Sequence, residues 1–439
     1  MANNSSNHPA GKRLPAAPKF GHAPAALAFW RRLVREALER GATTPFFLFS
    51  AQPVAERIAE LDGALAGAGF RPSGEAPPPK IRCRHWLSCK TQPVAPLLRW
   101  WRAQGRPIEV VSDFELRAAL AAGFPPAEIL VNGPAKHAWL PRHDLPGLAV
   151  NFDSPAELAA LLSQAKKWRW RTGVRVNTRE EFDPENPRFP TQFGFAPEEA
   201  VAALKKLRRA GVRVETISFH LRTNLASAQI YLRALAEVAE VCRAAAFAPA
   251  CLDLGGGLPV RHVLSRGGKV FDGEFGLRAW AAGLRQAVKL FAGLREIWLE
   301  NGRFVSAGAG VLVVKILDVK ERRGLRLLIC DGGRTLNALT SLWEQHRLFP
   351  VPARGGAETL TAVHGPTCMA FDQLARIPLP RSLRAGDHLV WMDAGAYHLP
   401  WETRFSHGHA AVWWHDERGL RPAREHQSFE DFWGQWREA

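Results

Sequence analysis

The sequence predicts a two-domain protein, a (β/α)8 barrel joined to a mostly antiparallel β domain that is built from both ends of the chain. Three observations predict this fold class. The chain has 439 residues, which suits a barrel of about 250 residues plus a smaller domain. Short apolar strands alternate with helices up to about residue 305. Beyond residue 305, β-rich segments with turn signals replace that alternation.

The N-terminal region is predicted to contain a leader and then elements that partly join the β domain. Residues 1–24 have no apolar signal core and are typical of a flexible leader. Within residues 25–75, the segment 25–43 has apolar residues at helical spacing, and 54–68 forms an amphipathic helix. Between them, TPFFLFS at 44–50 is a short strand that we expect to join the β domain.

Residues 76–305 are expected to form the barrel, because eight strands alternate with helices there. The predicted strands are IRCRHWLS, IEVVS, ILVNG, LAVNF, TGVRVN, TISFHL, ACLDLG and REIWLENG. The predicted helices between them are 91–104, 113–123, 154–167, 196–210, 225–246 and 275–292.

Residues 306–439 are expected to form the β domain, because they contain strands and little helix. Its predicted strands are GVLVVKILDVKER, RLLICDG, ETLTAVHG, DHLVWMD and AAVWWHD.

Composition and charge restrict the class of protein. The chain carries 58 basic and 42 acidic residues, a net charge of +16. Such an excess suits nucleic acid, an acidic protein partner or a solvated arginine-rich surface, and the last is favoured because no nucleic-acid-binding motif accompanies it. The six cysteines form no CxxC pair, which favours reduced thiols in a cytoplasm over a disulfide framework or a metal site. No apolar run is long enough to span a membrane.

Several polar side chains stand at the ends of predicted barrel strands, where barrel enzymes carry their chemistry. Lys90 follows a buried strand in HWLSCKTQP, and it is either a surface lysine or a residue that bonds a ligand. His220 in SFHLRTN is either a satisfied core histidine or an imidazole that stacks on a flat cofactor. Thr223 in the same run offers a hydroxyl to a phosphate.

Two further strand ends suggest an anion cradle and a charged pair. The glycines of LDLGGGLPV (252–260) resemble a phosphate-binding loop, although a turn with positive φ explains them equally well. In LENGRFV (299–305), Glu300 is suited to hold a ring nitrogen protonated and Arg303 to bind a phosphate. A structural ion pair is the alternative.

The β domain contributes two candidate residues of its own. Cys368 in VHGPTCMAFD is either a packed apolar residue or a reactive thiol. Tyr397 in DAGAYHLPWETRF has a hydroxyl that could reach a phosphate.

Together and in this order, these runs resemble the pyridoxal phosphate (PLP) decarboxylases of the alanine-racemase-like fold, which include diaminopimelate, ornithine and arginine decarboxylases. The resemblance runs from about Thr44 to Ala411 and is closest over 108–136, which includes Glu109, Ser112 and Glu115. It implies PLP as cofactor, an amino acid as substrate, and a homodimer with shared active sites.

The resemblance also implies a role for each matching residue. Lys90 would bind PLP as a Schiff base, and Glu300 would keep the ring nitrogen protonated, so that the ring accepts the electrons left when CO2 departs. Cys368 would reach the partner's site and donate a proton after CO2 loss. The implied catalytic residues are Lys90, His220 and Cys368. The implied cofactor-binding residues are Lys90, His220, Thr223, Gly255, Gly256, Gly257, Glu300, Gly302, Arg303, Tyr397 and Arg175, and the implied substrate-binding residues are Met369, Arg222 and Asp372.

The sequence departs from the family pattern around the lysine and the substrate. Leu87 stands where an aromatic residue is usual, and Thr91 and Gln92 stand where an asparagine is usual. Arg222 replaces a glycine, and Met369 replaces the acid that receives the distal amine of a diamino acid. Methionine cannot pair with an ammonium. We therefore expect decarboxylation of the α-carboxylate of an amino acid or amino-acid conjugate that is not a standard diamino acid.

Other functions are compatible with parts of this pattern. A PLP-dependent racemase would share the barrel but lack the cysteine segment. A non-enzymatic PLP-binding protein would be much shorter and would lack the β domain. The charge of +16 would also suit an acidic carrier protein that presents the substrate.

Overall fold

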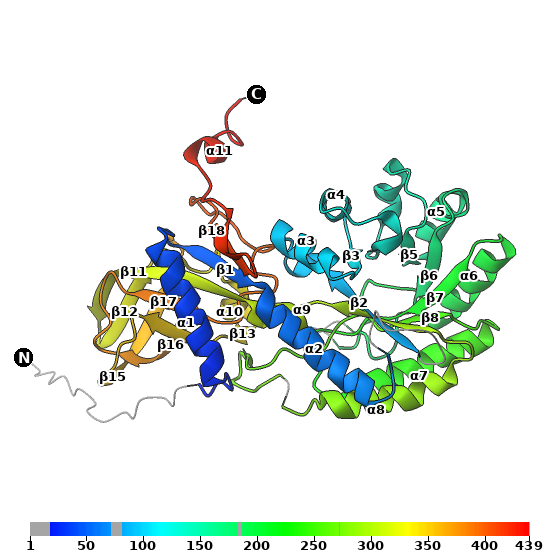
Figure 1. Ribbon diagram of the computed structural model, residues 1–439, viewed down its shortest axis with the longest axis horizontal. Helices are drawn as coiled ribbons and strands as arrows, with labels where there is room; N and C mark the ends of the chain where they lie inside the picture. Colours follow the sequence, from blue (N-terminus) through cyan, green and yellow to red (C-terminus); the bar gives the residue numbers. More distant parts are fainter. Residues whose placement is uncertain (1–17, 72–80, 183–186, 272, 439) are drawn as a thin grey trace, which may run out of the picture.

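The computed structural model of the chain describes residues 18–71, 81–182, 187–271 and 273–438. The two domains lie side by side, with the barrel on the right and the β domain on the left of Figure 1. The predicted leader falls largely on residues 1–17, which lie outside the described residues. Residues 18–23 precede the first helix, and there His22 Nε2 lies 2.8 Å from Asp393 Oδ2.

Eight parallel strands close into a barrel, which confirms the predicted fold class. Apolar runs form these strands because both faces are covered, by the barrel interior and by the surrounding helices. Around the barrel the order is β10, β2, β3, β4, β5, β6, β7 and β8. Their bounds are β2 (Arg82–Ser88), β3 (Ile108–Val110), β4 (Ile129–Val131), β5 (Ala149–Phe152), β6 (Arg171–Arg175), β7 (Val214–Ser218), β8 (Cys251–Asp253) and β10 (Glu296–Asn301).

Helices cover the outside of the barrel, and several begin at serine caps that the sequence places directly after a strand. The side chains of Ser112, Ser154 and Ser227 each accept a hydrogen bond from a backbone N–H in the first helical turn. The helices are α3 (Ala95–Ala103), α4 (Asp113–Ala121), α5 (Pro155–Lys167), α6 (Pro197–Arg209), α7 (Ala228–Ala244) and α8 (Leu277–Ala287).

Two connections differ from regular alternation. Residues 132–148, all of which the structure describes, contain 3-10 turns at Lys136–Ala138 and Leu140–Arg142 and no α-helix. The helix predicted from residue 91 begins only at Ala95, because a residue before proline is disfavoured in the α region, and Gln92 has φ −158° and ψ 89°. A 3-10 turn at Cys89–Thr91 follows β2 instead, so Lys90 lies directly at a strand end.

The β domain is built around one long strand, β11 (Gly310–Arg322), and is mostly antiparallel. The early strand β1 (Phe46–Ser50) lies between β11 and β18, antiparallel to the first and parallel to the second. Both ends of the chain therefore build this domain. The other strands are β12 (Leu325–Cys330), β14 (Leu348–Val351), β15 (Glu358–His364), β16 (Gln373–Pro380), β17 (His388–Trp391), β18 (Ala411–Asp416) and β19 (Gly419–Arg424).

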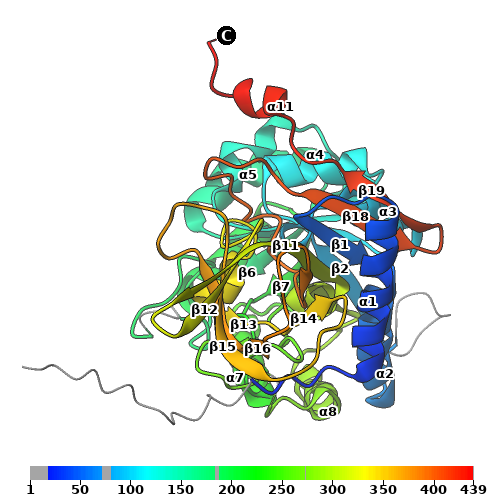
Figure 2. The same ribbon diagram turned by 90° about the vertical axis from the view of Figure 1, so that its left-hand side faces the viewer.

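Smaller elements join the two domains. Helix α2 (Ala51–Gly67) packs against α8 and α9 (Arg303–Ser306), while α1 (Pro24–Glu39) packs on the β domain. The two-residue strands β9 (Leu264–Ser265) and β13 (Glu344–Gln345) pair with each other, so a barrel loop is fixed to the β domain. Figure 2 shows the β domain in front of the barrel, with α11 (Phe429–Trp433) projecting above both. Within the described ranges, no helix is long and apolar enough to cross a membrane.

Candidate active site

Lys90 stands on the turn after β2 and forms an ion pair with a carboxylate from the neighbouring strand β3. Its Nζ donates to both oxygens of Glu109, at 2.9 and 2.7 Å. The Glu109 side chain is 1% exposed, whereas that of Lys90 is 34% exposed. Burial acts to lower the Lys90 pKa, but the attraction of Glu109 and Glu300 outweighs it and raises the pKa. The amine is therefore held at a fixed place and remains open to a ligand.

Glu300 is a buried anion at the end of β10. Its Oε1 accepts a hydrogen bond from Asn132 Nδ2 at 2.6 Å, and its Oε2 lies 3.5 Å from His220 Nδ1. Burial acts to raise the Glu300 pKa, but His220, Lys90 and Arg175 together lower it to about 2. The carboxylate is therefore ionised at neutral pH and suited to pair with a protonated ring nitrogen.

Asp253 is a second buried carboxyl group, at the end of the adjacent strand β8. Its Oδ2 accepts from Asn151 Nδ2 at 2.8 Å, and its Oδ1 accepts from the Gly255 N–H at 3.1 Å. Burial, and then the nearby charge of Glu300, raise the Asp253 pKa. The pKa of Asp253 is therefore raised while that of Glu300 is lowered, so Glu300 is the stronger acid of the two.

The glycine run fits against the loop that carries His220. The Gly256 backbone nitrogen lies 3.1 Å from His220 Nδ1, so the glycine run holds the ring in place beside Glu300. Gly255 and Gly257 have φ of 63° and 92°. A Cβ on Gly255 would lie 2.6 Å from His220 Nδ1, and one on Gly257 would lie 2.9 Å from the Arg222 carbonyl oxygen. The glycines are therefore required by both conformation and packing.

Arg303 brings together hydroxyl groups from both domains. Its Nε donates to Thr223 Oγ1 at 3.2 Å, and its guanidinium carbon lies 4.8 Å from the ring centroid of Tyr397. Its Nη1 donates to Glu344 Oε1 at 2.5 Å. Gly302, the residue before Arg303, lies against the Tyr397 hydroxyl. One cation and two hydroxyls at one place suit a phosphate group.

The two remaining barrel candidates lie nearby but are engaged with other residues. Arg175 Nη2 donates to Glu181 Oε1 at 2.6 Å, and Arg175 also contributes to the low pKa of Glu300. The Arg222 guanidinium lies 4.2 Å from the ring centroid of Phe182 and donates to the Glu180 carbonyl oxygen at 3.5 Å.

The segment with Cys368 and Met369 is a loop of the β domain between β15 and β16. Cys368 is exposed. Asp372 is 1% exposed and accepts from the Arg334 N–H at 2.7 Å and from Thr367 Oγ1 at 2.6 Å. Both oxygens of Asp372 accept hydrogen bonds within the loop, and its predicted role in substrate binding stays a prediction.

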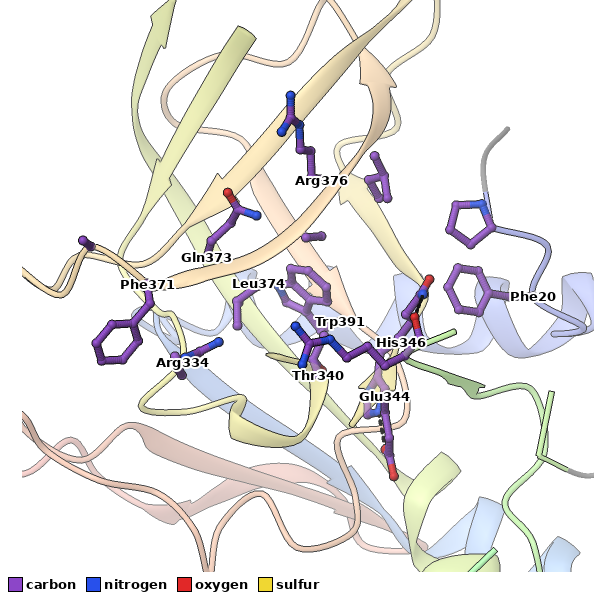
Figure 3. A pocket seen from close by; sticks show the side chains of 16 residues that line it. Phe20, Arg334, Thr340, Glu344, His346, Phe371, Gln373, Leu374, Arg376 and Trp391 are labelled. Atoms are coloured by element: carbon purple, nitrogen blue, oxygen red, sulfur yellow. Dashed lines mark hydrogen bonds and ion pairs between the residues drawn. The ribbon is translucent and has the colours of Figure 1, made fainter. Parts of the chain in front are cut away.

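A cavity of about 460 Å³ lies beside this loop (Figure 3). Arg266, Arg334 and Arg376 line it, and the Arg334 guanidinium lies 5.0 Å from the Phe371 ring centroid. Glu344 is the one carboxylate among the described residues that line it, and it already pairs with Arg303 and with His346 Nε2 at 2.8 Å. The surroundings of the loop are therefore cationic.

A barrel with a lysine at the end of one strand, an ionised acid at the end of the neighbouring strand and a phosphate-type cluster beside them defines a PLP-binding enzyme of barrel fold. The residues fit the cofactor at each end: an amine for its aldehyde, a buried anion for its ring nitrogen, and hydroxyls with an arginine for its phosphate.

Comparison with known proteins identifies the family. The model for the pyridoxal binding domain of pyridoxal-dependent decarboxylases matches residues 80–307. The chain is 30% identical to diaminopimelate decarboxylase of Deinococcus radiodurans over 83% of this chain and 89% of that protein. It is 27% identical to the enzyme of the same name from Zymomonas mobilis, over 81% of this chain and 83% of that protein.

Solved structures agree on the fold. The diaminopimelate decarboxylase of Helicobacter pylori complexed with L-lysine superposes with a TM-score of 0.77 at 20% identity, covering 92% of this chain and 99% of that one. The chain belongs to the family of pyridoxal-dependent decarboxylases. It is an amino-acid carboxy-lyase with PLP as cofactor, which sets aside the racemase and the non-enzymatic PLP-binding protein.

Sequence reasoning missed several residues of the site. Asn132, Asn151 and Asp253 were visible as single polar residues near the ends of apolar strands, the same signal that selected Glu300. Glu344, by contrast, carries no local signal, because its partner Arg303 is 41 residues away in the chain.

Proposed function

We propose that this decarboxylase removes the α-carboxylate of an amino acid, free or in a conjugate, whose side chain carries no distal ammonium. The observation that carries the proposal is Met369, which stands beside Cys368 where the resemblance places an acid. The relatives named above are diaminopimelate decarboxylases, so this chain would keep their chemistry with a different substrate. The arginines of the neighbouring cavity add positive charge where an ammonium would need negative charge.

Within the proposed site, PLP supplies the electron-accepting ring that makes loss of CO2 possible. Lys90 would bond the cofactor, and Glu300 would keep the ring nitrogen protonated. His220 would contact the ring, while Thr223, Arg303 and Tyr397 would bind the phosphate together with the glycine loop Gly255–Gly257.

The site is proposed to be completed by a second copy of the chain. Cys368 is exposed on the β domain, and its Sγ would supply the proton that replaces the carboxylate on the α-carbon of a substrate in the partner's barrel. This arrangement requires a homodimer. Six cysteines scattered through a large chain with no CxxC pair suit a cytoplasmic location, which we include in the proposal.

A substrate panel tests the proposal. Purified enzyme with PLP is incubated with neutral, acidic and diamino acids and with a carrier-tethered amino acid, and CO2 and amine are measured by mass spectrometry. An unpaired ammonium costs a few kcal/mol, so kcat/KM for ornithine, lysine and meso-diaminopimelate should be lower than for the best substrate by about 100-fold or more. Turnover of meso-diaminopimelate at the highest rate in the panel would contradict the proposal.

The cofactor lysine is tested separately from the substrate. Borohydride should reduce the PLP–protein bond and leave the label on Lys90, located by peptide mass spectrometry. Lys90→Ala should lose the label, whereas Lys136→Ala changes a lysine that is buried against Glu157 and should keep it. A reducible adduct at wild-type level in Lys90→Ala would reject the assignment.

A further inference from the structure

The hydroxyl of Thr91 is a buried polar group without a hydrogen-bond partner in the described structure. Thr91 is 1% exposed, and its Oγ1 makes no hydrogen bond there. Buried hydroxyls are nearly always bonded, and leaving one unbonded is costly. Thr91 directly follows Lys90. The missing hydrogen-bond partner of its hydroxyl is therefore expected to be a group of the bound ligand.

The position of the hydroxyl indicates which ligand group that is. A Cβ built on Gly302 would lie 3.0 Å from Thr91 Oγ1 and 3.2 Å from the Tyr397 hydroxyl. Both hydroxyls therefore face the same small space above the bare Cα of Gly302. The next residue, Arg303, donates to Thr223 Oγ1 and stacks on the Tyr397 ring. Thr91 thus belongs to the cluster that suits a phosphate.

The backbone of Thr91 supports the same placement. Its carbonyl oxygen accepts the N–H of Tyr397 at 2.7 Å, which ties the β-domain residue to the turn that carries Lys90. In PLP the aldehyde and the phosphate arm are neighbouring substituents of the ring. Consecutive residues of one turn can therefore serve both, with Lys90 at the aldehyde and Thr91 at the phosphate.

We propose that Thr91 Oγ1 donates a hydrogen bond to the phosphate of PLP and is a cofactor-binding residue of this enzyme. The inference rests on the proposed placement of the phosphate at Tyr397 and Arg303. It gives a function to one of the residues by which this chain departs from the family pattern around the lysine.

The test compares PLP with pyridoxal, which has the same ring and aldehyde but no phosphate. Thr91→Val replaces the hydroxyl by a methyl group of similar size, and Thr91→Ser restores it. A hydrogen bond to a charged group contributes enough that Thr91→Val should raise the dissociation constant of PLP about tenfold. The dissociation constant of pyridoxal should stay the same in both proteins, and Thr91→Ser should bind PLP within about threefold of wild type.

A matched control and a spectroscopic measurement separate the phosphate contact from a packing effect. Thr216→Val removes another hydroxyl that is 1% exposed and unbonded, in β7, and should leave PLP binding unchanged. The 31P resonance of bound PLP should move in Thr91→Val and remain in place in Thr216→Val. Thr91→Ala provides the same comparison if the valine variant does not fold.

Two results would overturn the inference. In the first, Thr91→Val weakens PLP and pyridoxal equally, so the hydroxyl acts through the protein and not on the phosphate. In the second, PLP binding and the 31P resonance are unchanged. Failure of the proposed cofactor placement would look different, because Tyr397→Phe would then leave the ratio of the PLP and pyridoxal dissociation constants as in wild type.

Discussion

Replacing Glu344 by Gln should destabilise the enzyme without PLP more than the enzyme with PLP. Glu344 accepts from Arg303 Nη1 at 2.5 Å and from His346 Nε2 at 2.8 Å, and all three side chains are largely buried. Glutamine keeps the size of the side chain but removes its charge. Arg303 then remains buried without a full countercharge. A buried charge left without its partner strongly destabilises the folded state.

The pKa of Glu344 gives the magnitude. Burial acts to raise this pKa, but His346 and Arg303 lower it from 4.5 to about 2. A folded-state pKa below the unfolded value contributes stability above pH 4.5, and that stability is lost as the pH falls toward 2. At neutral pH the contribution is about 3 kcal/mol, which agrees with the roughly 3–5 kcal/mol expected when one partner of a buried pair is removed.

PLP should offset part of this loss, because its phosphate supplies a countercharge to Arg303. The free energy of unfolding is measured by urea titration with tryptophan fluorescence, with and without PLP, at pH 7. Folding and PLP binding form a closed thermodynamic cycle. If Glu344→Gln lowers the free energy of unfolding less with PLP than without it, the variant must bind PLP more tightly than wild type by the same free energy. If PLP offsets half of the loss in the free energy of unfolding, the dissociation constant of PLP should be about tenfold lower for Glu344→Gln than for wild type.

Glu36 in α1 provides the control for Glu344. Glu36→Gln breaks an exposed pair with Arg40 and should change the free energy of unfolding by less than about 1 kcal/mol. Equal losses with and without PLP, or weaker PLP binding by Glu344→Gln, would show that Arg303 does not contact the phosphate. A loss below about 1 kcal/mol at pH 7 would contradict the role of the buried pair itself.

Three further outcomes are expected. Met369→Asp should raise kcat/KM for ornithine relative to the best substrate by about tenfold or more, and an unchanged ratio would contradict the proposed specificity. Lys90→Ala and Cys368→Ala, each nearly inactive, should recover about a quarter of wild-type activity after subunit exchange, because half of the dimers are mixed and each carries one intact site of two. No recovery after verified exchange would place both residues in one chain's site. Burial, and then Glu109, raise the Glu115 pKa from 4.5 to about 7, so this acid costs stability as the pH rises from 4.5 through 7. Glu115→Gln should therefore be more stable than wild type at pH 8 by about 2 kcal/mol, allowing for its partial exposure, and no more stable at pH 4; equal stability at pH 8 would count against the raised pKa.

The sequence alone determined the alternation of strands and helices and the residues at the strand ends. These features are local, because burial on both faces makes a strand continuously apolar and a helix repeats its apolar face every turn. Lys90, His220, Glu300 and the glycine loop were visible for the same reason, as polar or flexible residues interrupting apolar runs.

Only the tertiary structure decided which distant segments meet. β1 lies between β11 and β18, and the edge strands β14, β16 and β19 escaped prediction because each contains proline. Asp372 became a loop-organising residue because backbone N–H and hydroxyl groups around it needed an acceptor. The pairing of Glu344 with Arg303 likewise arises from the meeting of two domains. Hydrogen bonds and ion pairs across long chain separations leave no periodic signal in the sequence, so their partners are fixed only when the chain folds.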